Sequence, residues 1–294
     1  MRILIDPKAG PCPGVKRAIR MVERQLKEND NLVALGPVIH NQKEVDRLTS
    51  LGLKSAPQPV DAREVSFRAG QCLFIRTHGI TPELHERLRQ LEIQTIDGTC
   101  PTVKKVQDAI AEYAKRDYRI IIVGKSTHPE VIGLLGYCGG KGQVISTLQE
   151  CEGISAGQKT LLIAQTTVER EKFNDIAEKL SSILDDVVVI DSTCRQINKR
   201  HQDMIDFARS VDVLLLVGGH DSSNTGVLFE ICKKENSHSH RIESVGDIKT
   251  EWFQPDITVG ITGSASTPLW QLEEVHSFLQ SLPMGSNYLK RRTT

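Results

Sequence analysis

A threefold repeat in the spacing of cysteine and glycine constrains this chain more than any other feature of its sequence. In each repeat a cysteine is followed, 24 positions later, by a glycine that ends a run of Val, Ile and Leu; the pairs are Cys12 and Gly36, Cys100 and Gly124, and Cys194 and Gly218. Four positions after each glycine comes a hydrogen-bonding side chain, namely His40, His128 or Ser222. A period of about 90 residues with this internal agreement indicates three copies of one structural unit.

Short apolar runs alternate along the chain with longer, charged segments that have the character of helices. The runs are LVALG, CLFIRTHG, RIIIVG, LLIAQTT, VVVIDSTC, VLLLVGG and ITVGITG. Continuous apolar strands separated by helices are typical of parallel sheets that are covered on both faces. The sequence therefore predicts an α/β fold of three similar domains around a pseudo-threefold axis, with the three repeated cysteines facing a shared centre.

The repeat also predicts domain boundaries in a chain whose 294 residues are enough for two or three folding units. We expect domains at residues 1–97 with Cys12, residues 98–191 with Cys100, and residues 192–294 with Cys194 and a C-terminal tail. The strand nearest the N-terminus can also be assigned to the third domain.

Further along each repeat, another strand ends in a cluster of polar residues. The clusters are Thr77-His78-Gly79, Gln165-Thr166-Thr167 and Gly263-Ser264-Ala265-Ser266. Ligands of open α/β sheets bind beyond the carboxyl ends of the strands, where helix N-termini also favour anions. Imidazole, hydroxyl and amide groups in such loops suit a phosphate or diphosphate. We expect that site to include His40, His78, His128, Ser222, Ser223, Asn224 and Ser266.

Seven cysteines, without a dense disulfide spacing, fit a reducing compartment. No CxxC pair occurs, which argues against a structural zinc site. Three converging thiolates can hold a 4Fe-4S cluster and leave one iron open to a substrate. The spacing alone does not separate a 4Fe-4S from a 3Fe-4S cluster. The cysteines outside the repeat are expected to be small core residues; they are Cys72, Cys138, Cys151 and Cys232.

Glu130 is the only carboxylate among the loop motifs. A carboxyl group beside a metal-bound hydroxyl can deliver the proton that turns it into water. A glutamate in the first turn of a helix that starts at Pro129 would instead stabilise the helix N-terminus. The spacing supports both interpretations equally.

Charge and hydropathy exclude several classes of protein. Lysine plus arginine equals aspartate plus glutamate, at 37 each, so no overall positive charge attracts nucleic acid or an anionic membrane. No apolar stretch approaches the roughly 20 residues of a membrane helix, and the opening residues lack a signal-peptide core, so we expect a cytoplasmic location. Gly124-Lys125-Ser126 resembles the end of a P-loop, but Arg119 stands where that motif needs glycine.

Several longer motifs carry a resemblance to a known family. They are Cys-Pro-Gly-Val-Lys-Arg-Ala-Ile, Val-Ile-His-Asn, Thr-His-Gly-Ile, Asp-Gly-Thr-Cys-Pro, Thr-His-Pro-Glu-Val, Gln-Thr-Thr, Ser-Ser-Asn and Ala-Ser-Thr-Pro. From Cys12 to about Pro268 the chain resembles the LytB or IspH family of 4-hydroxy-3-methylbut-2-enyl diphosphate reductases.

The resemblance implies a trefoil-like arrangement of three α/β domains around a 4Fe-4S cluster bound by Cys12, Cys100 and Cys194. It implies that Glu130, Thr166 and His128 form the catalytic set, and that the diphosphate lies among the histidines, serines and Asn224 named above. The implied reaction uses two electrons and two protons to remove an allylic hydroxyl as water. Electrons would come from a ferredoxin or flavodoxin, because the chain has no recognisable flavin or nicotinamide site.

Two departures from the family pattern keep alternatives open. Pro11 and Pro13 flank the first cysteine, where an aromatic residue usually precedes it, and Arg195-Gln196-Ile197 follows the third in place of small and hydroxyl residues. The alternatives are a divergent paralogue acting on another diphosphate, a quinolinate-synthase-like cluster enzyme, and a cluster-based redox sensor or carrier without enzymatic activity.

Overall fold

Three parallel sheets of four strands each organise the chain in the computed structural model, which describes residues 1–59, 63, 66–67 and 70–282. In spatial order, one sheet consists of β3 (Lys54–Ala56), β2 (Leu32–Leu35), β4 (Cys72–Ile75) and β5 (Gln94–Asp97). The second consists of β7 (Gly142–Ile145), β6 (Arg119–Val123), β8 (Thr160–Ala164) and β9 (Val187–Val189). The third consists of β11 (Ser239–Ile242), β10 (Val213–Val217), β12 (Thr258–Gly263) and β1 (Arg2–Ile5).

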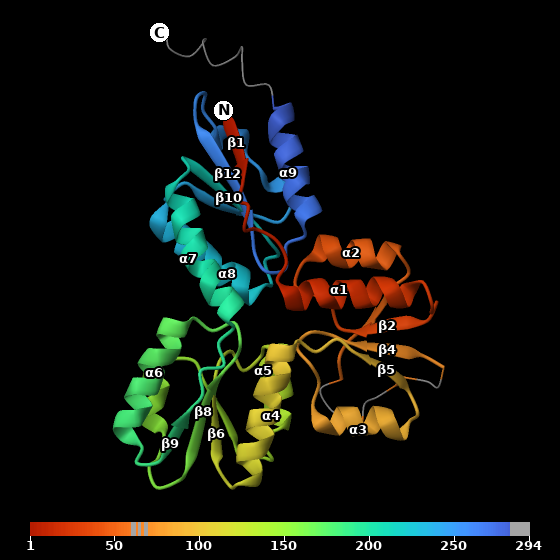
Figure 1. The fold of residues 1–294 in the computed structure, drawn as a ribbon, viewed down its shortest axis with the longest axis vertical. Coiled ribbons are helices and arrows are strands. Elements are labelled where there is room, and N and C mark those ends of the chain that lie inside the picture. The colour runs from red at the N-terminus through yellow and green to blue at the C-terminus, as the bar shows by residue number, and fades with distance from the viewer. Residues whose placement is uncertain (60–62, 64–65, 68–69, 283–294) are drawn as a thin grey trace. The chain divides into compact units, whose positions relative to one another are not determined.

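Helices cover both faces of every sheet (Figure 1). The first sheet carries α1 (Pro13–Leu26) and α2 (Gln42–Ser50) on one face and α3 (Pro82–Gln90) on the other. The second carries α4 (Pro101–Lys115) and α5 (Pro129–Gly136) opposite α6 (Arg170–Ile183). The third carries α7 (Arg195–Arg209) and α8 (Ser223–Glu235) opposite α9 (Leu269–Ser281). Short 3₁₀ helices lie at Gln149–Gly153, Val245–Asp247 and Thr250–Trp252.

The inner strands form because their residues can be apolar on both faces. Every residue of β6, RIIIV, and of β10, VLLLV, is buried, and Val and Ile are well suited to a pleated surface. All seven apolar runs recognised in the sequence contain a strand. The predicted α/β class with three parallel-sheet units is therefore confirmed.

The N-terminal strand β1 completes the third sheet, although it is the first strand of the chain. It pairs in parallel with β12, with Ile3 opposite Val259. A buried ion pair secures the connection, because Arg200 Nη2 lies 2.5 Å from Asp6 Oδ2, and the hydroxyl of Thr262 donates to the same carboxylate at 2.8 Å. β1 thus occupies the sheet position that β5 and β9 occupy in the other two.

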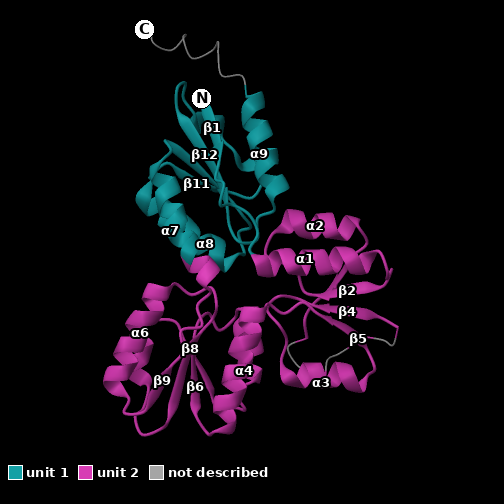
Figure 2. Cartoon of the chain, viewed as in Figure 1, with its two compact units in different colours: residues 1–12, 199–294 teal, residues 13–198 magenta. Residues whose placement is uncertain are grey.

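The chain divides into two compact units (Figure 2). Unit 1 comprises Met1–Cys12 and Lys199–Thr294 and holds the sheet of β1, β10, β11 and β12. Unit 2 comprises Pro13–Asn198 and holds the other two sheets. Residues 283–294, the C-terminal tail of the third expected domain, lie outside the described residues.

In the part of the chain that the structure describes, no helix combines the length and the apolar character that crossing a membrane would need.

Candidate cluster and diphosphate site

The three repeated cysteines are held by the same backbone hydrogen bond. The N–H group of each donates to the carbonyl of the second residue after an inner strand. Cys12 donates to Ala265 at 3.0 Å, Cys100 to Thr77 at 3.0 Å, and Cys194 to Thr166 at 2.8 Å. Because each cysteine is tied to a polar loop at the carboxyl end of its own sheet, the sequence repeat is also a geometric repeat.

An aspartate shapes each of the three cysteine loops. The Oδ1 atom accepts from the N–H group two residues ahead; the bonds are Asp6 to Lys8 at 2.8 Å, Asp97 to Thr99 at 2.9 Å and Asp191 to Thr193 at 3.0 Å. Such Asx turns bend the chain sharply after an edge strand. The sequence interpretation missed these aspartates, although an Ile-Asp pair ends all three segments and could have revealed them.

A helix begins directly after each of these cysteines. The three helices are α1, α4 and α7, and none of them has an acidic residue in its first turn. The positive end of a helix dipole stabilises thiolates and other anions. Proline at the first position, as in Pro13 and Pro101, suits a helix start because its missing N–H group needs no partner there. Pro13, which follows Cys12, therefore has a structural reason.

The cysteines fall into two groups that match the sequence prediction. Cys12, Cys100 and Cys194 are partly exposed and form no disulfide bond, so a cluster could reach them. The other four are free but buried, and burial raises the pKa of Cys138 and Cys232 to about 12. Those four are inert core residues. A set of three accessible thiols at three helix N-termini fits a 4Fe-4S cluster, whose iron ions bind cysteine thiolates.

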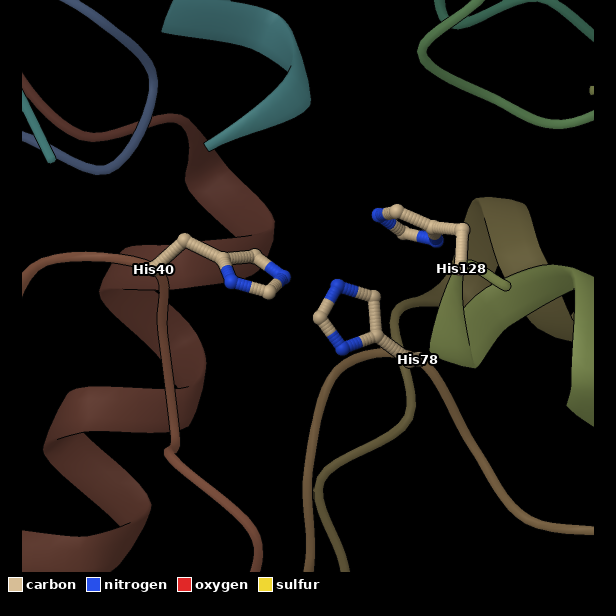
Figure 3. Close-up of side chains that lie close together, drawn as sticks. All are labelled: His40, His78 and His128. Carbon is tan, nitrogen blue, oxygen red and sulfur yellow. The ribbon is translucent and has the colours of Figure 1, made fainter. Parts of the chain in front are cut away.

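Three histidines in unit 2 point toward one another (Figure 3). His40 follows β2, His78 follows β4, and His128 precedes α5. Their ring centroids lie 5.0 Å apart for His40 and His78, 5.2 Å for His78 and His128, and 5.8 Å for His40 and His128. One nitrogen from each ring lies within 4.8 Å of the others, so the group can converge on one anion or one metal ion.

The site keeps two of these imidazoles neutral. Burial lowers the pKa of His128 to about 4, and it lowers the pKa of His78 well below its ordinary value of 6.5. His128 is also the N-cap of α5, and its Nδ1 accepts from the N–H group of Glu130 at 3.2 Å. Its proton must then be on Nε2, which is left to donate to a ligand.

Glu130 is a buried carboxyl group held by a single threonine. Thr166 donates to it twice, from its backbone N–H at 2.6 Å and from its hydroxyl at 2.8 Å. Burial nevertheless outweighs these two bonds and raises the pKa of Glu130 to about 7. A carboxyl group with that pKa carries its proton part of the time at neutral pH and can act as a general acid. Glu130 also lies in the first turn of α5, as the second sequence interpretation expects, and its role as a proton donor stays a prediction.

Thr166 joins this acid to a cysteine loop. Its N–H and hydroxyl bind Glu130, while its carbonyl accepts from the N–H group of Cys194. The carboxyl group and the cysteine backbone are therefore connected through one residue. Sequence spacing alone did not indicate this link, because Glu130, Thr166 and Cys194 follow three different strands.

Unit 1 carries the predicted serines and asparagine. Ser222 caps α8 by accepting from the N–H group of Thr225 at 3.2 Å. Asn224 is buried, and its side-chain oxygen has no hydrogen-bond partner. Buried polar atoms normally have one, so this amide is suited to a ligand. Ser266 lies beside Ser264, with their hydroxyls 3.1 Å apart, on the loop that accepts from Cys12.

The second departure from the family pattern borders a cavity. Arg195 and Gln196 line a space of about 520 Å³ in unit 2, together with Cys194 and Lys105. Arg195 therefore places a positive charge at the side of the cysteine loop.

Each unit thus gathers part of the predicted set. Unit 2 brings together His40, His78, His128, Glu130 and Thr166, and it contains Cys100 and Cys194. Unit 1 contains Cys12, Ser222, Ser223, Asn224 and Ser266.

Comparisons with known proteins point to one family. The sequence model of the family described as LytB protein matches residues 3–280. The curated 4-hydroxy-3-methylbut-2-enyl diphosphate reductase of Aquifex aeolicus is 39% identical over 287 residues, which cover 96% of this chain and 97% of that protein. The protein of the same name from Caldanaerobacter subterraneus subsp. tengcongensis is 38% identical and covers 96% of this chain and 98% of its own length.

Two solved structures are similar as well. One is a (E)-4-hydroxy-3-methyl-but-2-enyl diphosphate reductase, described as the terminal enzyme of the non-mevalonate pathway; it has a TM-score of 0.71 and 37% identity, and the match covers 96% of this chain and all of that one. The other is the E-1-hydroxy-2-methyl-but-2-enyl-4-diphosphate reductase from Plasmodium falciparum, with a TM-score of 0.84, 24% identity, and 96% and 89% of the two chains covered. At that identity the second comparison supports the fold alone.

Proposed function

The chain belongs to the LytB protein family, and we propose that it reduces 4-hydroxy-3-methylbut-2-enyl diphosphate to isopentenyl and dimethylallyl diphosphates. In this reaction the allylic carbon–oxygen bond breaks, two electrons and two protons enter, and the oxygen leaves as water. The observation that carries the proposal is the buried Glu130, held by the same threonine that anchors the loop of Cys194. Removing a hydroxyl group as water needs a proton donor, and a buried carboxyl group with a raised pKa can be one.

Cys12, Cys100 and Cys194 are the ligands we propose for a 4Fe-4S cluster. Their matching hydrogen bonds, their partial exposure and the three helix N-termini support this assignment. When bound, such a cluster supplies electrons and an iron without a protein ligand that can act as a Lewis acid.

The diphosphate group is the part of the substrate that the polar loops would bind. Neutral histidines donate hydrogen bonds through N–H groups, and His128 has its Nε2–H available. The backbone N–H groups at the start of α8 offer further donors in unit 1. We therefore assign diphosphate binding to His40, His78, His128, Ser222, Ser223, Asn224 and Ser266.

Glu130 is the proton donor in this proposal, and Thr166 keeps its carboxyl group oriented. Because the pKa of Glu130 is about 7, the carboxyl group can release a proton and regain it at neutral pH. His128 orients the start of the same helix through its bond to the backbone of Glu130.

The electrons would come from a separate protein, a ferredoxin or a flavodoxin. None of the cysteines forms a disulfide bond in the part of the chain that the structure describes, which supports a reducing compartment such as the cytoplasm.

The test is anaerobic turnover of 4-hydroxy-3-methylbut-2-enyl diphosphate by the full chain after cluster reconstitution, with a reduced viologen dye as donor. We expect turnover by the wild type and a loss of roughly 100-fold or more in Glu130→Gln, a range typical of losing a general acid. Glu44→Gln is a matched control, because Glu44 is also buried in the first turn of a helix, α2, in the same unit. Its turnover should stay close to that of the wild type.

Three results would contradict the proposal in different ways. Binding of diphosphate and cluster without turnover would indicate a paralogue with another substrate. Binding of a dicarboxylate in place of diphosphate would favour a quinolinate-synthase-like enzyme. A redox response that is unchanged in Glu130→Gln, with no turnover in either protein, would favour a sensor.

A further inference from the structure

Arg76 is a buried arginine at the carboxyl end of β4. It is the first residue after that strand, and its exposed fraction is 5%. Its guanidinium group lies over Gly36 and leaves little room for a side chain there, because a Cβ atom on that glycine would stand 3.0 Å from Cζ and Nη1 of Arg76. Gly36 also has a φ of +77°, which favours glycine. The first repeat is thus built to admit a guanidinium group at this place.

The other two repeats have neutral residues at the equivalent position. Gln165 directly follows β8 and packs against Gly124, where a Cβ atom would lie 2.9 Å from the Cβ of Gln165. Ser264 directly follows β12 and packs against Gly218, with a corresponding distance of 3.3 Å to its hydroxyl. Both have hydrogen-bond partners, since Gln165 bonds to Lys125 and Thr167, and Ser264 bonds to Thr267. Only the first repeat puts a charge here.

No carboxylate among the described residues forms an ion pair with Arg76. Toward the described residues, the guanidinium group donates a long hydrogen bond from Nε to the side-chain oxygen of Gln58, at 3.4 Å. Burial lowers the pKa of Arg76 to about 10, so the group stays positively charged at neutral pH. By contrast, the buried Arg200 of unit 1 is paired with Asp6. A buried charge without a counter-ion is unfavourable unless a ligand supplies one.

The charge of Arg76 acts on the histidine group. Burial is the largest cause of the lowered pKa values of His78 and His128, and the charge of Arg76, two residues before His78 in the chain, lowers both pKa values further. The two imidazoles are neutral and contribute hydrogen bonds but no charge. A multiply charged anion bound there would have Arg76 as its buried cationic partner.

We propose that Arg76 supplies the fixed positive charge that binds the diphosphate of the substrate, beside His40, His78 and His128. This role rests on the proposed function and adds a binding residue to it. Charge-assisted hydrogen bonds and ion pairs are stronger than neutral ones, so a guanidinium group raises affinity for a diphosphate far more than for a neutral molecule.

The experiment measures binding of inorganic diphosphate to the full chain by calorimetry, without turnover. Arg76→Gln gives the first repeat a glutamine, as in the second repeat, where Gln165 packs against Gly124. We expect its affinity for diphosphate to fall by roughly 10- to 100-fold, the range for losing a charged hydrogen-bond partner. Arg76→Lys, which keeps the charge, should recover much of that loss.

Arg119→Gln is the matched control. Arg119 is also a buried arginine of unit 2, but it starts β6 and bonds to Thr160 and Ser155. Its removal should leave diphosphate affinity unchanged. Inorganic monophosphate provides a second comparison, because the effect of Arg76→Gln should be smaller for an anion of lower charge.

Thermal unfolding of the ligand-free protein separates a binding role from a structural one. No carboxylate in the described part of the chain pairs with the Arg76 cation, which destabilises the empty site, so Arg76→Gln should unfold at the same temperature as the wild type or higher. If the variant unfolds at a lower temperature or fails to fold, Arg76 is structural and the inference is wrong.

The two proposals fail in different ways. If the wild type does not bind diphosphate, the proposed function loses its substrate class. If the wild type binds it and Arg76→Gln binds it equally well, only the role of Arg76 is refuted.

Discussion

At the residue scale, burial decides the protonation of the groups proposed to be catalytic. The same loss of water that keeps His78 and His128 neutral raises the pKa of Glu130 to about 7. Desolvation always penalises the charged form, so it removes protons from imidazoles and retains them on carboxyl groups. The site therefore combines neutral donors with an acid that can give up its proton near neutral pH.

The first prediction concerns the pH dependence of turnover. If protonated Glu130 is the acid, the rate should fall as the pH rises through about 7. The hydroxyl of Thr166 lowers this pKa, so Thr166→Val should move the fall to higher pH by roughly half a unit to one unit. Turnover measured over a pH series, at saturating dye, gives both the fall in the wild type and its shift in Thr166→Val. A shift toward lower pH in Thr166→Val would contradict the assignment.

Glu130 should also make stability depend on pH. Its pKa in the folded protein, about 7, is above the ordinary value of 4.5, so the folded state binds the proton more tightly. This contribution is fully present below pH 4.5 and is lost as the pH rises to about 7, a total of roughly 3 kcal/mol. Denaturant unfolding from pH 5 to pH 8 should show this slope in the wild type and a flatter one in Glu130→Gln. Equal slopes would mean that Glu130 is ionised throughout.

The third prediction separates ligand cysteines from core cysteines. In the folded, cluster-free chain, iodoacetamide should modify Cys12, Cys100 and Cys194, because only these thiols are partly exposed. Peptide mass spectrometry should find the other four unmodified until the protein is unfolded. After cluster reconstitution the three should be protected together. Persistent labelling of one of them would exclude it as a ligand.

At the element scale, the working parts are the loops that connect an edge strand to a helix. Each of these three loops contains a turn formed by an aspartate side chain and carries a cysteine. Each continues into a helix that has no acidic residue in its first turn. The edge strand and the polar loop of the neighbouring inner strand are joined by the cysteine N–H group. Each of these cysteines is thereby positioned by rigid elements on both sides.

A change in one of these turns should affect cluster assembly. Asp97→Ala removes the acceptor of the Thr99 N–H group and should destabilise the loop of Cys100 by about 1 kcal/mol. The iron content after reconstitution should fall. Asp97→Asn keeps an acceptor and should behave like the wild type, and Asp108→Ala, at an exposed position on α4, is the neutral control. Full iron content in Asp97→Ala would show that the turn is dispensable.

At the scale of the whole molecule, folding and ligand binding are linked. Any ligand that binds only the folded chain raises its stability, by about 2.7 kcal/mol at 100 times the dissociation constant. For units of this size that corresponds to a rise of roughly 5–10 °C in the unfolding temperature. Inorganic diphosphate should produce this rise in the wild type, and Arg76→Gln should need a higher concentration for the same effect. A dye-based melting series measures it, and sulfate at equal ionic strength is the control.

The printed sequence was enough to predict the α/β class and the inner strands, and it contains the repeated spacing of the cysteines. Inner strands are recognisable because both of their faces are buried, so β10 is apolar throughout and β6 is apolar after Arg119. The three cysteines are recognisable because each lies 24 residues before a glycine, although the residues around them differ. These are local or periodic properties, and the printed sequence contains them in full.

The remaining features, namely the edge strands and the contacts between distant residues, appear only in the folded chain. The edge strands β3, β7 and β11 were not predicted, because they are short and partly polar, as the sequence KSA of β3 illustrates. They become strands by pairing with an apolar neighbouring strand. The place of β1 beside β12, the two bonds from Thr166 to Glu130 and the surroundings of the Arg76 guanidinium depend on residues far apart in the chain. Hydrogen-bond partners and desolvation arise from such distant residues, and they set the charges on which the proposed chemistry depends.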